Sequence, residues 1–331
     1  MRSKMKKLKI AQIGAEHDHA TFIFDSLLRL GDDFEVVGYA VPDGEKDFAK
    51  EKNVPKYSVD EIFAMKDLDA VAIETSELDL TKYALMAAER GLAVHMDKPG
   101  GIELSEFERL ISKVKENGTV FHTGYMYRYN EAVIKLMQDV RCGKLGEIYS
   151  VEAQMNCMHS KGKREWLGRF PGGMLFFLGC HLIDLIYRIQ GEPDEVIPMS
   201  CPTGIDGVGS CDFGMAVLKY KNGVSFAKTT SVEPGGFLRR QLVVCGSRGT
   251  VQLLPFEAYP EADSGLLHTG VREAYGNSWR DDGERYYTAP ADRYDGMMRA
   301  FASYVCGDTA NPYTPDYELS LYKLILRCCG K

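Results

Sequence analysis

The chain has 331 residues, of which 45% are hydrophobic and 26% are charged, the usage of a globular protein long enough for two domains. Forty Lys and Arg residues against 47 Asp and Glu residues give a formal net charge of −7. A protein with this balance has no overall positive field to attract a phosphate backbone, so nucleic acid is not an expected partner.

The cysteines and the N-terminal segment bear on the compartment. The nine cysteines are an odd number with no C-x-x-C pair, which favours reduced thiols over a disulfide framework or a zinc ribbon. Residues 1–9 are basic, but the apolar run behind them is interrupted at residues 16–19, unlike a signal peptide or an anchor. No stretch reaches the roughly 18 apolar residues of a membrane helix. We expect a cytoplasmic protein without a membrane partner.

The first 125 residues alternate short apolar runs with segments whose apolar residues recur at helical spacing. The expected strands are residues 8–13, 34–41, 70–74, 93–96 and 120–123, and the expected helices are residues 21–30, 43–52, 59–65, 80–90 and 104–117. Strands that alternate with helices in this way form βαβ units. Residues 6–125 are therefore predicted to form an α/β domain with a parallel sheet.

The pattern changes after about residue 125. The expected helices are now residues 130–139, 175–189, 294–304 and 317–327, and the expected strands are residues 148–158, 213–220, 224–230, 241–245 and 250–254. Asn222-Gly223 is a hairpin signal, which predicts that the strands on either side of it are antiparallel neighbours. Residues 126–331 are therefore predicted to form an α+β domain.

The turn after the first strand is where a parallel sheet usually approaches a dinucleotide pyrophosphate. Residues 14–19 read Gly-Ala-Glu-His-Asp-His. The first glycine of the G-x-G-x-x-G pattern is present, but Glu16 and His19 stand at the second and third positions. Val41 occupies the place of the acidic residue that usually ends the second strand, and Asp43 is the nearest carboxylate. We expect a dinucleotide still to bind, more weakly than with three glycines, and Glu16→Gly to tighten its binding.

Two further segments carry candidate catalytic groups. Lys98 follows the fourth strand and precedes Pro99, so it should lie at the carboxyl end of a buried strand, where ligands bind. His181 and Asp184 are three residues apart and share one face of a predicted helix. A core histidine satisfied by a neighbouring carboxylate is the alternative interpretation of that pair.

Taken together, these segments resemble the glucose-fructose oxidoreductase/inositol dehydrogenase (Gfo/Idh/MocA) family of nicotinamide-dependent sugar dehydrogenases. The likeness covers nearly the whole chain and rests on residues 10–14, 69–76, 97–99, 124–130 and 172–184. It implies a Rossmann domain and a second domain with a large, mostly antiparallel sheet whose outer face pairs with another subunit in a dimer or tetramer. It also implies a cis Lys98-Pro99 bond and a last helix that packs back near the first domain.

The resemblance implies that hydride passes between NAD or NADP and a carbinol carbon of a sugar, cyclitol or glycoside. His181 is the expected base, and Lys98 the cation that orients the substrate and stabilises the alkoxide. Expected cofactor contacts come from Gly14, Ala15, His17, His19, Asp43, Thr75, Ser76, Asp97 and Pro99. Expected substrate contacts come from Tyr127, Arg128, His159, Trp166 and Asp184.

One departure from the family leaves alternatives open. An aspartate usually lies four residues before the helix histidine, and here that residue is Phe177. The chain could instead cleave a glycoside by oxidation and elimination with the cofactor used transiently, or be a binding protein that has lost catalysis. His17 and His19 also suggest a metal, but two histidines fall short of the three protein ligands of a catalytic zinc, so no metal site is assigned.

Overall fold

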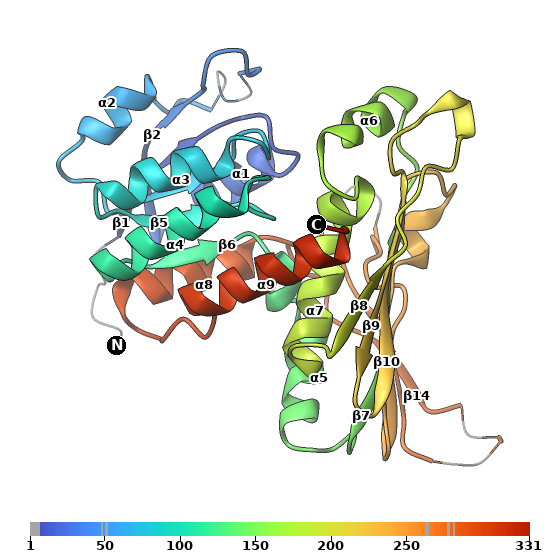
Figure 1. Ribbon diagram of the computed structural model, residues 1–331. Coiled ribbons are helices and arrows are strands. Elements are labelled where there is room, and N and C mark those ends of the chain that lie inside the picture. The colour runs from blue at the N-terminus through green and yellow to red at the C-terminus, as the bar shows by residue number, and fades with distance from the viewer. Residues whose placement is uncertain (1–6, 48, 50–51, 262–264, 277–278, 281) are drawn as a thin grey trace. The chain divides into compact units, whose positions relative to one another are not determined.

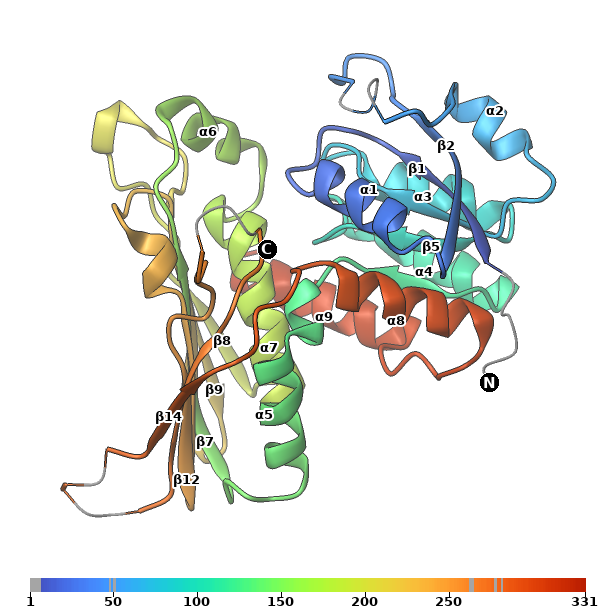
Figure 2. The ribbon, with the colours of Figure 1, turned by 180° about the vertical axis from the view of Figure 1, so that it is seen from behind.

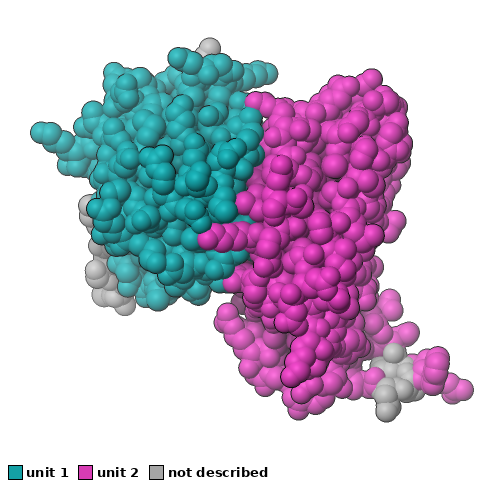
Figure 3. Space-filling model, in the orientation of Figure 1, with its two compact units in different colours: residues 1–126, 294–322 teal, residues 127–293, 323–331 magenta. Residues whose placement is uncertain are grey.

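The structure is a computed structural model that describes residues 7–47, 49, 52–261, 265–276, 279–280 and 282–331. The chain divides into two compact units (Figure 3): unit 1 comprises Met1–Met126 and Tyr294–Tyr322, and unit 2 comprises Tyr127–Arg293 and Lys323–Lys331. Unit 1 thus includes the helix Asp295–Cys306 and the first part of the helix Pro315–Cys328, whereas only the last helix was expected near the first domain. None of the described helices is long and apolar enough to cross a membrane.

Unit 1 contains a six-stranded parallel sheet of order β3-β2-β1-β4-β5-β6 (Figure 1). Its strands are β1 (Leu8–Ile13), β2 (Phe34–Ala40), β3 (Lys56–Tyr57), β4 (Ala70–Ile73), β5 (Ala93–Met96) and β6 (Phe121–Thr123). The five predicted strands are confirmed, and the two-residue β3 is additional. Strands β2 and β3 follow β1 on one side of it, and β4, β5 and β6 follow on the other side. The strand order therefore reverses between β1 and β4.

Helices cover both faces of this sheet. They are α1 (Ala20–Arg29), α2 (Val59–Ala64), α3 (Leu80–Glu89), α4 (Leu104–Asn117), α8 (Asp295–Cys306) and α9 (Pro315–Cys328). Helices α3 and α4 lie on one face, and α1 and α8 lie on the other (Figures 1 and 2). Helix α9 is tied to this unit by Tyr322, whose ring stacks on Phe107 of α4 with centroids 4.4 Å apart and whose hydroxyl donates to the Gly101 carbonyl at 3.1 Å.

The predicted helix at residues 43–52 is wrong where the structure describes it. Residues 43–47 and 49 form turns and irregular chain, while residues 48, 50 and 51 lie outside the described part. The Asp47 carboxylate accepts the Ala49 amide proton at 3.1 Å and binds Lys56 at 2.9 Å. A side chain that bonds the backbone two residues on offers a competitor to helical hydrogen bonding.

Unit 2 is built on an eight-stranded sheet of order β14-β13-β12-β11-β7-β10-β9-β8, antiparallel except for β7 and β10. Its strands are β7 (Ile148–Asn156), β8 (Glu195–Pro198), β9 (Phe213–Tyr220), β10 (Gly223–Thr230), β11 (Gln241–Gly246), β12 (Gly249–Leu253), β13 (Gly270–Ala274) and β14 (Glu284–Tyr287). The Asn222-Gly223 turn joins antiparallel β9 and β10, as predicted. Strands β8, β13 and β14 were not predicted; the outer strand β14 has four exposed residues and so no apolar alternation.

The helices of unit 2 are α5 (Glu131–Arg141), α6 (Lys161–Trp166) and α7 (Cys180–Gln190). Helices α5 and α7 lie along one face of the sheet (Figures 1 and 2). A π-helical turn, Leu175–Gly179, runs directly into α7, and short 3-10 turns occupy Met126–Tyr129, Leu167–Arg169, Ile205–Gly207 and Gly236–Arg239. The predicted helix at residues 175–189 is therefore present, with a wider first turn.

Candidate active site

The turn after β1 comes close to the end of β4. Gly14 has φ +105°, and a Cβ atom at this position would lie 2.2 Å from the Thr75 amide nitrogen, so only glycine fits. The buried Gln12 side chain holds the turn in place by donating to the Gly14 carbonyl at 3.2 Å and the Ala20 carbonyl at 3.0 Å. The amides of the turn and of the residues after β4 therefore lie together at the point where the strand order reverses.

These amides already hold an anion. The Ala15 amide donates to Glu45 Oε2 at 2.6 Å, and the Ser76 amide donates to Glu45 Oε1 at 3.4 Å. Burial raises the pKa of Glu45, against the effect of these amide hydrogen bonds. Backbone N–H groups that donate to a carboxylate are of the kind that bind phosphate oxygens. The carboxylate that faces the turn is thus Glu45, which the sequence reasoning missed.

The two other acidic residues considered for this turn are exposed. Asp43 is exposed, and its contact with a cofactor stays a prediction. Glu16 is also exposed, so solvent screens part of the repulsion between its charge and a pyrophosphate.

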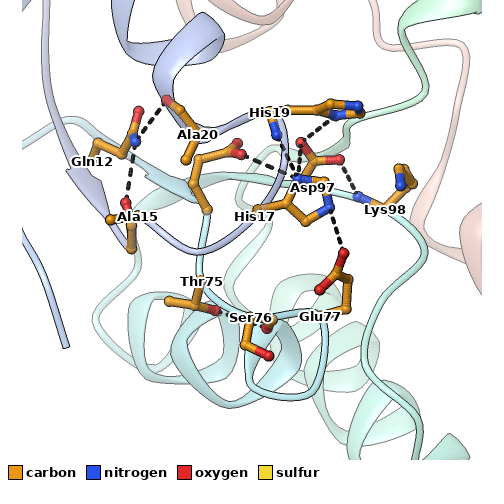
Figure 4. A network of polar contacts seen from close by, with 12 residues as sticks. Gln12, Ala15, His17, His19, Ala20, Thr75, Ser76, Glu77, Asp97 and Lys98 are labelled. Atoms are coloured by element: carbon orange, nitrogen blue, oxygen red, sulfur yellow. Dashed lines mark hydrogen bonds and ion pairs between the residues drawn. The ribbon is translucent and has the colours of Figure 1, made fainter. Parts of the chain in front are cut away.

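The two histidines of the turn converge on the carboxylate after β5 (Figure 4). Asp97 Oδ2 lies 2.9 Å from His19 Nδ1 and 3.2 Å from His17 Nδ1, and Asp97 Oδ1 accepts the Lys98 amide proton at 2.6 Å. Burial alone would raise the pKa of Asp97, but the two imidazoles and Lys98 together hold it well below its ordinary value. Asp97 therefore connects the altered glycine turn to the backbone of Lys98.

Behind Asp97 lies a second layer of buried titratable groups. Glu74 Oε2 is 3.8 Å from His17 Nδ1, and Glu74 Oε1 is 3.6 Å from His95 Nε2. Burial and the nearby charge of Asp97 raise the pKa of Glu74 well above its ordinary value. Burial lowers the pKa of His17 to about 3 and that of His95 to about 4. Burial and the nearby carboxylate thus favour the neutral form of Glu74, and burial favours the neutral form of both imidazoles.

Lys98 and its neighbours occupy the predicted position. The Lys98 side chain is 2% exposed, and its peptide bond to Pro99 is cis, as predicted. Thr75 and Ser76 are buried beside the turn. Of the candidates in unit 1, the structure brings together Gly14, Ala15, His17, His19, Thr75, Ser76, Asp97, Lys98 and Pro99.

In unit 2, two of the expected substrate residues bind each other. Arg128 donates to Asp184 through Nε at 3.1 Å and through an Nη nitrogen at 2.8 Å. Both side chains are almost fully buried. A bidentate pair of this kind fixes the segment before α5 against α7, so a positioning role for Arg128 and Asp184 accounts for their geometry.

His181 lies beside a second polar group. Its ring meets the Tyr127 ring edge to face, with centroids 5.0 Å apart. The Tyr127 hydroxyl donates to Glu257 Oε2 at 2.6 Å, and Arg240 and Arg293 bind the same carboxylate at 3.1 and 2.7 Å. Burial and the charge of Glu257 raise the pKa of Tyr127, so Tyr127 stays protonated. The partners Glu257, Arg240 and Arg293 come from distant segments and carry no local motif.

Phe177 sits in an aromatic cluster. Its ring contacts Trp166 edge to face at 5.5 Å and His159 at 6.3 Å. Lys163 Nζ lies 4.5 Å from the Phe177 centroid and 3.9 Å from that of Trp166, which is within the range of cation–π attraction. His159 and Trp166 therefore gather around the residue that departs from the family pattern.

Comparison with known proteins assigns both parts of the chain. A family described as an oxidoreductase family with a NAD-binding Rossmann fold matches residues 8–125, and one described as the Gfo/Idh/MocA C-terminal domain matches residues 133–252. A trans-1,2-dihydrobenzene-1,2-diol dehydrogenase from Bos taurus is 27% identical over 243 residues, which is 70% of each chain.

Solved structures share the fold. An aldose-aldose oxidoreductase from Caulobacter crescentus, complexed with glycerol, superposes with a TM-score of 0.79 at 20% identity over 98% of both chains. A 3-ketoreductase from Actinomadura kijaniata, in complex with NADP and TDP-benzene, superposes with a TM-score of 0.78 at 18% identity, covering 97% of this chain and 96% of that chain.

Proposed function

Because the chain belongs to the Gfo/Idh/MocA family of oxidoreductases and has its NAD(P)-binding Rossmann domain, we propose that it transfers hydride at a carbinol carbon of a sugar, cyclitol or glycoside. The nicotinamide, when bound, accepts or gives the hydride. The chain must then bind the dinucleotide, move the hydroxyl proton and stabilise negative charge on the substrate oxygen.

The residues of the β1 turn fit a dinucleotide. The Ala15 and Ser76 amides donate to a carboxylate in the structure, and a phosphate oxygen offers them the same kind of acceptor. Gly14 leaves room for the backbone of the turn against Thr75. Glu45 must leave the two amides when a pyrophosphate binds there, which lowers the affinity. Val41 supplies no carboxylate for the adenosine ribose, and we propose that either NAD or NADP is accepted.

The main support for the proposal is the position of Lys98. It is a buried lysine at the carboxyl end of a parallel strand, with its backbone held by Asp97 at 2.6 Å. A cation held in a site with little water stabilises a developing alkoxide far better than one in solvent. We assign Lys98 this role and assign His181 that of the base, since the neighbouring Tyr127 stays protonated.

Lys98→Met tests the assignment. Substrates such as D-glucose, myo-inositol and methyl glucosides are offered with NAD or NADP, and reduced cofactor is measured by absorbance. Loss of one stabilising donor is expected to lower kcat about 100- to 1000-fold, with cofactor affinity and thermal midpoint retained. Lys82→Met, at a position on α3, is the matched control and should leave kcat unchanged. Equal turnover by wild type and Lys98→Met would remove Lys98 from the mechanism.

Phe177 favours a second candidate. A phenyl ring cannot accept a proton or orient an imidazole, so Phe177 cannot act as the family's usual aspartate does. The chain then either uses the cofactor transiently in glycoside cleavage or binds it without turnover. Glycoside cleavage with no net reduced cofactor distinguishes the first, and cofactor binding with no turnover on any polyol distinguishes the second.

The sheet of unit 2 supports self-association. Ile197, Val217, Phe226 and Val243 form a row across β8, β9, β10 and β11, interrupted only by Glu152 of β7. These four apolar side chains are half-buried or exposed. We propose that this face pairs with a second copy in a cytoplasmic dimer or tetramer. Phe226→Asp should dissociate it, and a wild-type solution mass of 37.0 kDa at micromolar concentration would contradict the pairing.

A further inference from the structure

Three side chains of the β1 turn and the β5 end form a group with the chemistry of a metal site. We infer that His17, His19 and Asp97 bind a divalent transition-metal ion, for which Zn²⁺ is the best fit. The three come from segments 78 residues apart, so the third ligand that the local sequence lacks is supplied by the fold. The inference concerns side chains alone and does not depend on hydride transfer.

The spacing of the donor atoms suits one ion. One nitrogen from each imidazole and one Asp97 oxygen all lie within 4.8 Å of one another. The Asp97 oxygen is 3.2 Å from His17 Nδ1 and 2.9 Å from His19 Nδ1. Ligand atoms of a tetrahedral zinc site, with bonds of about 2.0–2.1 Å, lie roughly 3.3 Å apart. Small side-chain rotations would therefore bring all three donors to coordination distance.

His17 Nδ1 lies between the turn backbone and Asp97. The His19 amide donates to this nitrogen at 3.2 Å, and an ion bound there would take the place of that hydrogen bond. The same nitrogen lies 3.2 Å from Asp97 Oδ2, so one cation could be held by both atoms.

The surroundings of the three side chains resemble the outer shell of a metal site. The far nitrogen of His17, Nε2, lies 3.7 Å from Glu77 Oε1, and metal-binding histidines usually direct the other nitrogen to a carboxylate. Glu74 and Glu77 are buried beside Asp97, and Glu74 Oε2 lies 3.8 Å from His17 Nδ1. These two carboxyl groups would surround an ion held by His17, His19 and Asp97.

The donor set also selects the kind of ion. Imidazole and carboxylate together suit Zn²⁺, Mn²⁺ or Fe²⁺, whereas Mg²⁺ and Ca²⁺ prefer oxygen ligands alone. Three protein ligands leave the fourth tetrahedral position of Zn²⁺ to an oxygen of another molecule.

The experiment uses the full chain, stripped with EDTA and titrated with Zn²⁺ by calorimetry, with Mg²⁺ as the control ion. We expect one Zn²⁺ per chain and no binding of Mg²⁺. Titration with Co²⁺ should give the visible absorption of a four-coordinate nitrogen and oxygen site. Since the chain has nine free cysteines, a thiolate-to-cobalt band in the near ultraviolet would place the ion elsewhere and overturn the inference.

Variants locate the ion. His19→Ala and Asp97→Asn should each lower Zn²⁺ affinity at least about 100-fold, since even outer-shell changes cost 10–100-fold. His268→Ala removes an imidazole that stacks on Tyr287 in unit 2 and should change nothing. Wild-type Zn²⁺ affinity in both variants would overturn the site. If Asp97→Asn fails to fold, His19→Ala still tests the site, because the His19 side chain is partly exposed. NADH binding is measured on the EDTA-stripped wild type, because the ion and the dinucleotide would meet the same turn: its absence there would overturn the proposed function alone.

Discussion

Buried carboxylates are stabilised differently in the two units. In unit 2 each of three buried carboxylates meets an arginine: Arg128 pairs with Asp184 at 2.8 Å, Arg164 with Asp212 at 3.3 Å, and Arg240 with Glu257 at 3.1 Å. In unit 1 the buried carboxyl groups after β4 and β5 face imidazoles instead, at 2.9 to 3.8 Å.

The difference corresponds to two roles: the buried carboxylates of unit 2 support the fold, and those of unit 1 lie among groups that can bind a ligand. A guanidinium stays charged at every physiological pH, so the arginine pairs of unit 2 are permanent and hold segments in place. A neutral imidazole has a nitrogen lone pair that can bind a metal ion, and burial lowers the pKa of His17 and of His95, which favours that neutral form. The histidine-faced carboxylates of unit 1 can therefore share a cation with their partners where the arginine-paired ones cannot.

Breaking an arginine pair should have the largest effect. Arg128→Met leaves Asp184 buried without its main partner, which is expected to lower the free energy of unfolding by about 3–5 kcal/mol in urea titrations. Arg29→Met is the control, since its partner Asp295 lies at a partly exposed position and such pairs contribute less than about 1 kcal/mol. Arg128→Met/Asp184→Leu should recover most of the loss. A loss below 1 kcal/mol in the single variant would contradict the structural role of the pair.

Gly14 tests the close approach of the β1 turn. Gly14→Ala places a methyl group 2.2 Å from the Thr75 amide nitrogen at φ +105°, and we expect a loss of about 3 kcal/mol in stability together with loss of NADH binding. Gly44→Ala has a similar φ of +91° but no atom within 4 Å, so it should cost only about 1 kcal/mol. Equal losses of stability in the two variants would show that the loss comes from backbone strain and not from contact with Thr75.

Glu273 of β13 extends the comparison to pH. Burial opposes its ionisation, but hydrogen bonds from Lys135, Tyr286 and Lys144 prevail and lower its pKa to about 2. A carboxyl group with a lowered pKa contributes stability that is complete above its unfolded value of about 4.5 and is lost as the pH falls toward 2. Glu273→Gln should therefore lose about 2 kcal/mol at pH 7 and progressively less as the pH falls from about 4.5 through 2. Unfolding measured across this range checks it, with exposed Glu284→Gln as the control.

The smallest effect is expected at the turn amides. Glu45→Gln removes a charge that competes with a pyrophosphate, and it should tighten NADH binding about fivefold in calorimetry. Glu16→Gln should change the affinity less, because that side chain is exposed. Weaker binding by Glu45→Gln would show instead that Glu45 bonds the nucleotide.

Local pattern was enough to predict most of unit 1. The apolar runs of β1, β4 and β5 and the helical spacing of α1, α3 and α4 each depend on residues close in sequence. Lys98 was placed correctly because a strand end determines which side of the sheet a residue reaches. The edge strands β8 and β14 were missed because edge positions are half solvated and lack the apolar alternation on which the prediction depends. Strand β13, which lies between β12 and β14, was also missed.

The sequence by itself determined the alternation of strands and helices and the position of Lys98 after a buried strand. Only the tertiary structure decided that Gly14 packs against Thr75, that Asp97 meets His17 and His19, that Glu45 binds the turn amides, and that Arg128 is bound to Asp184. Secondary structure follows from the spacing of neighbouring residues. Charge pairing depends on which distant side chains share a buried volume, and that is settled only when the sheet is assembled.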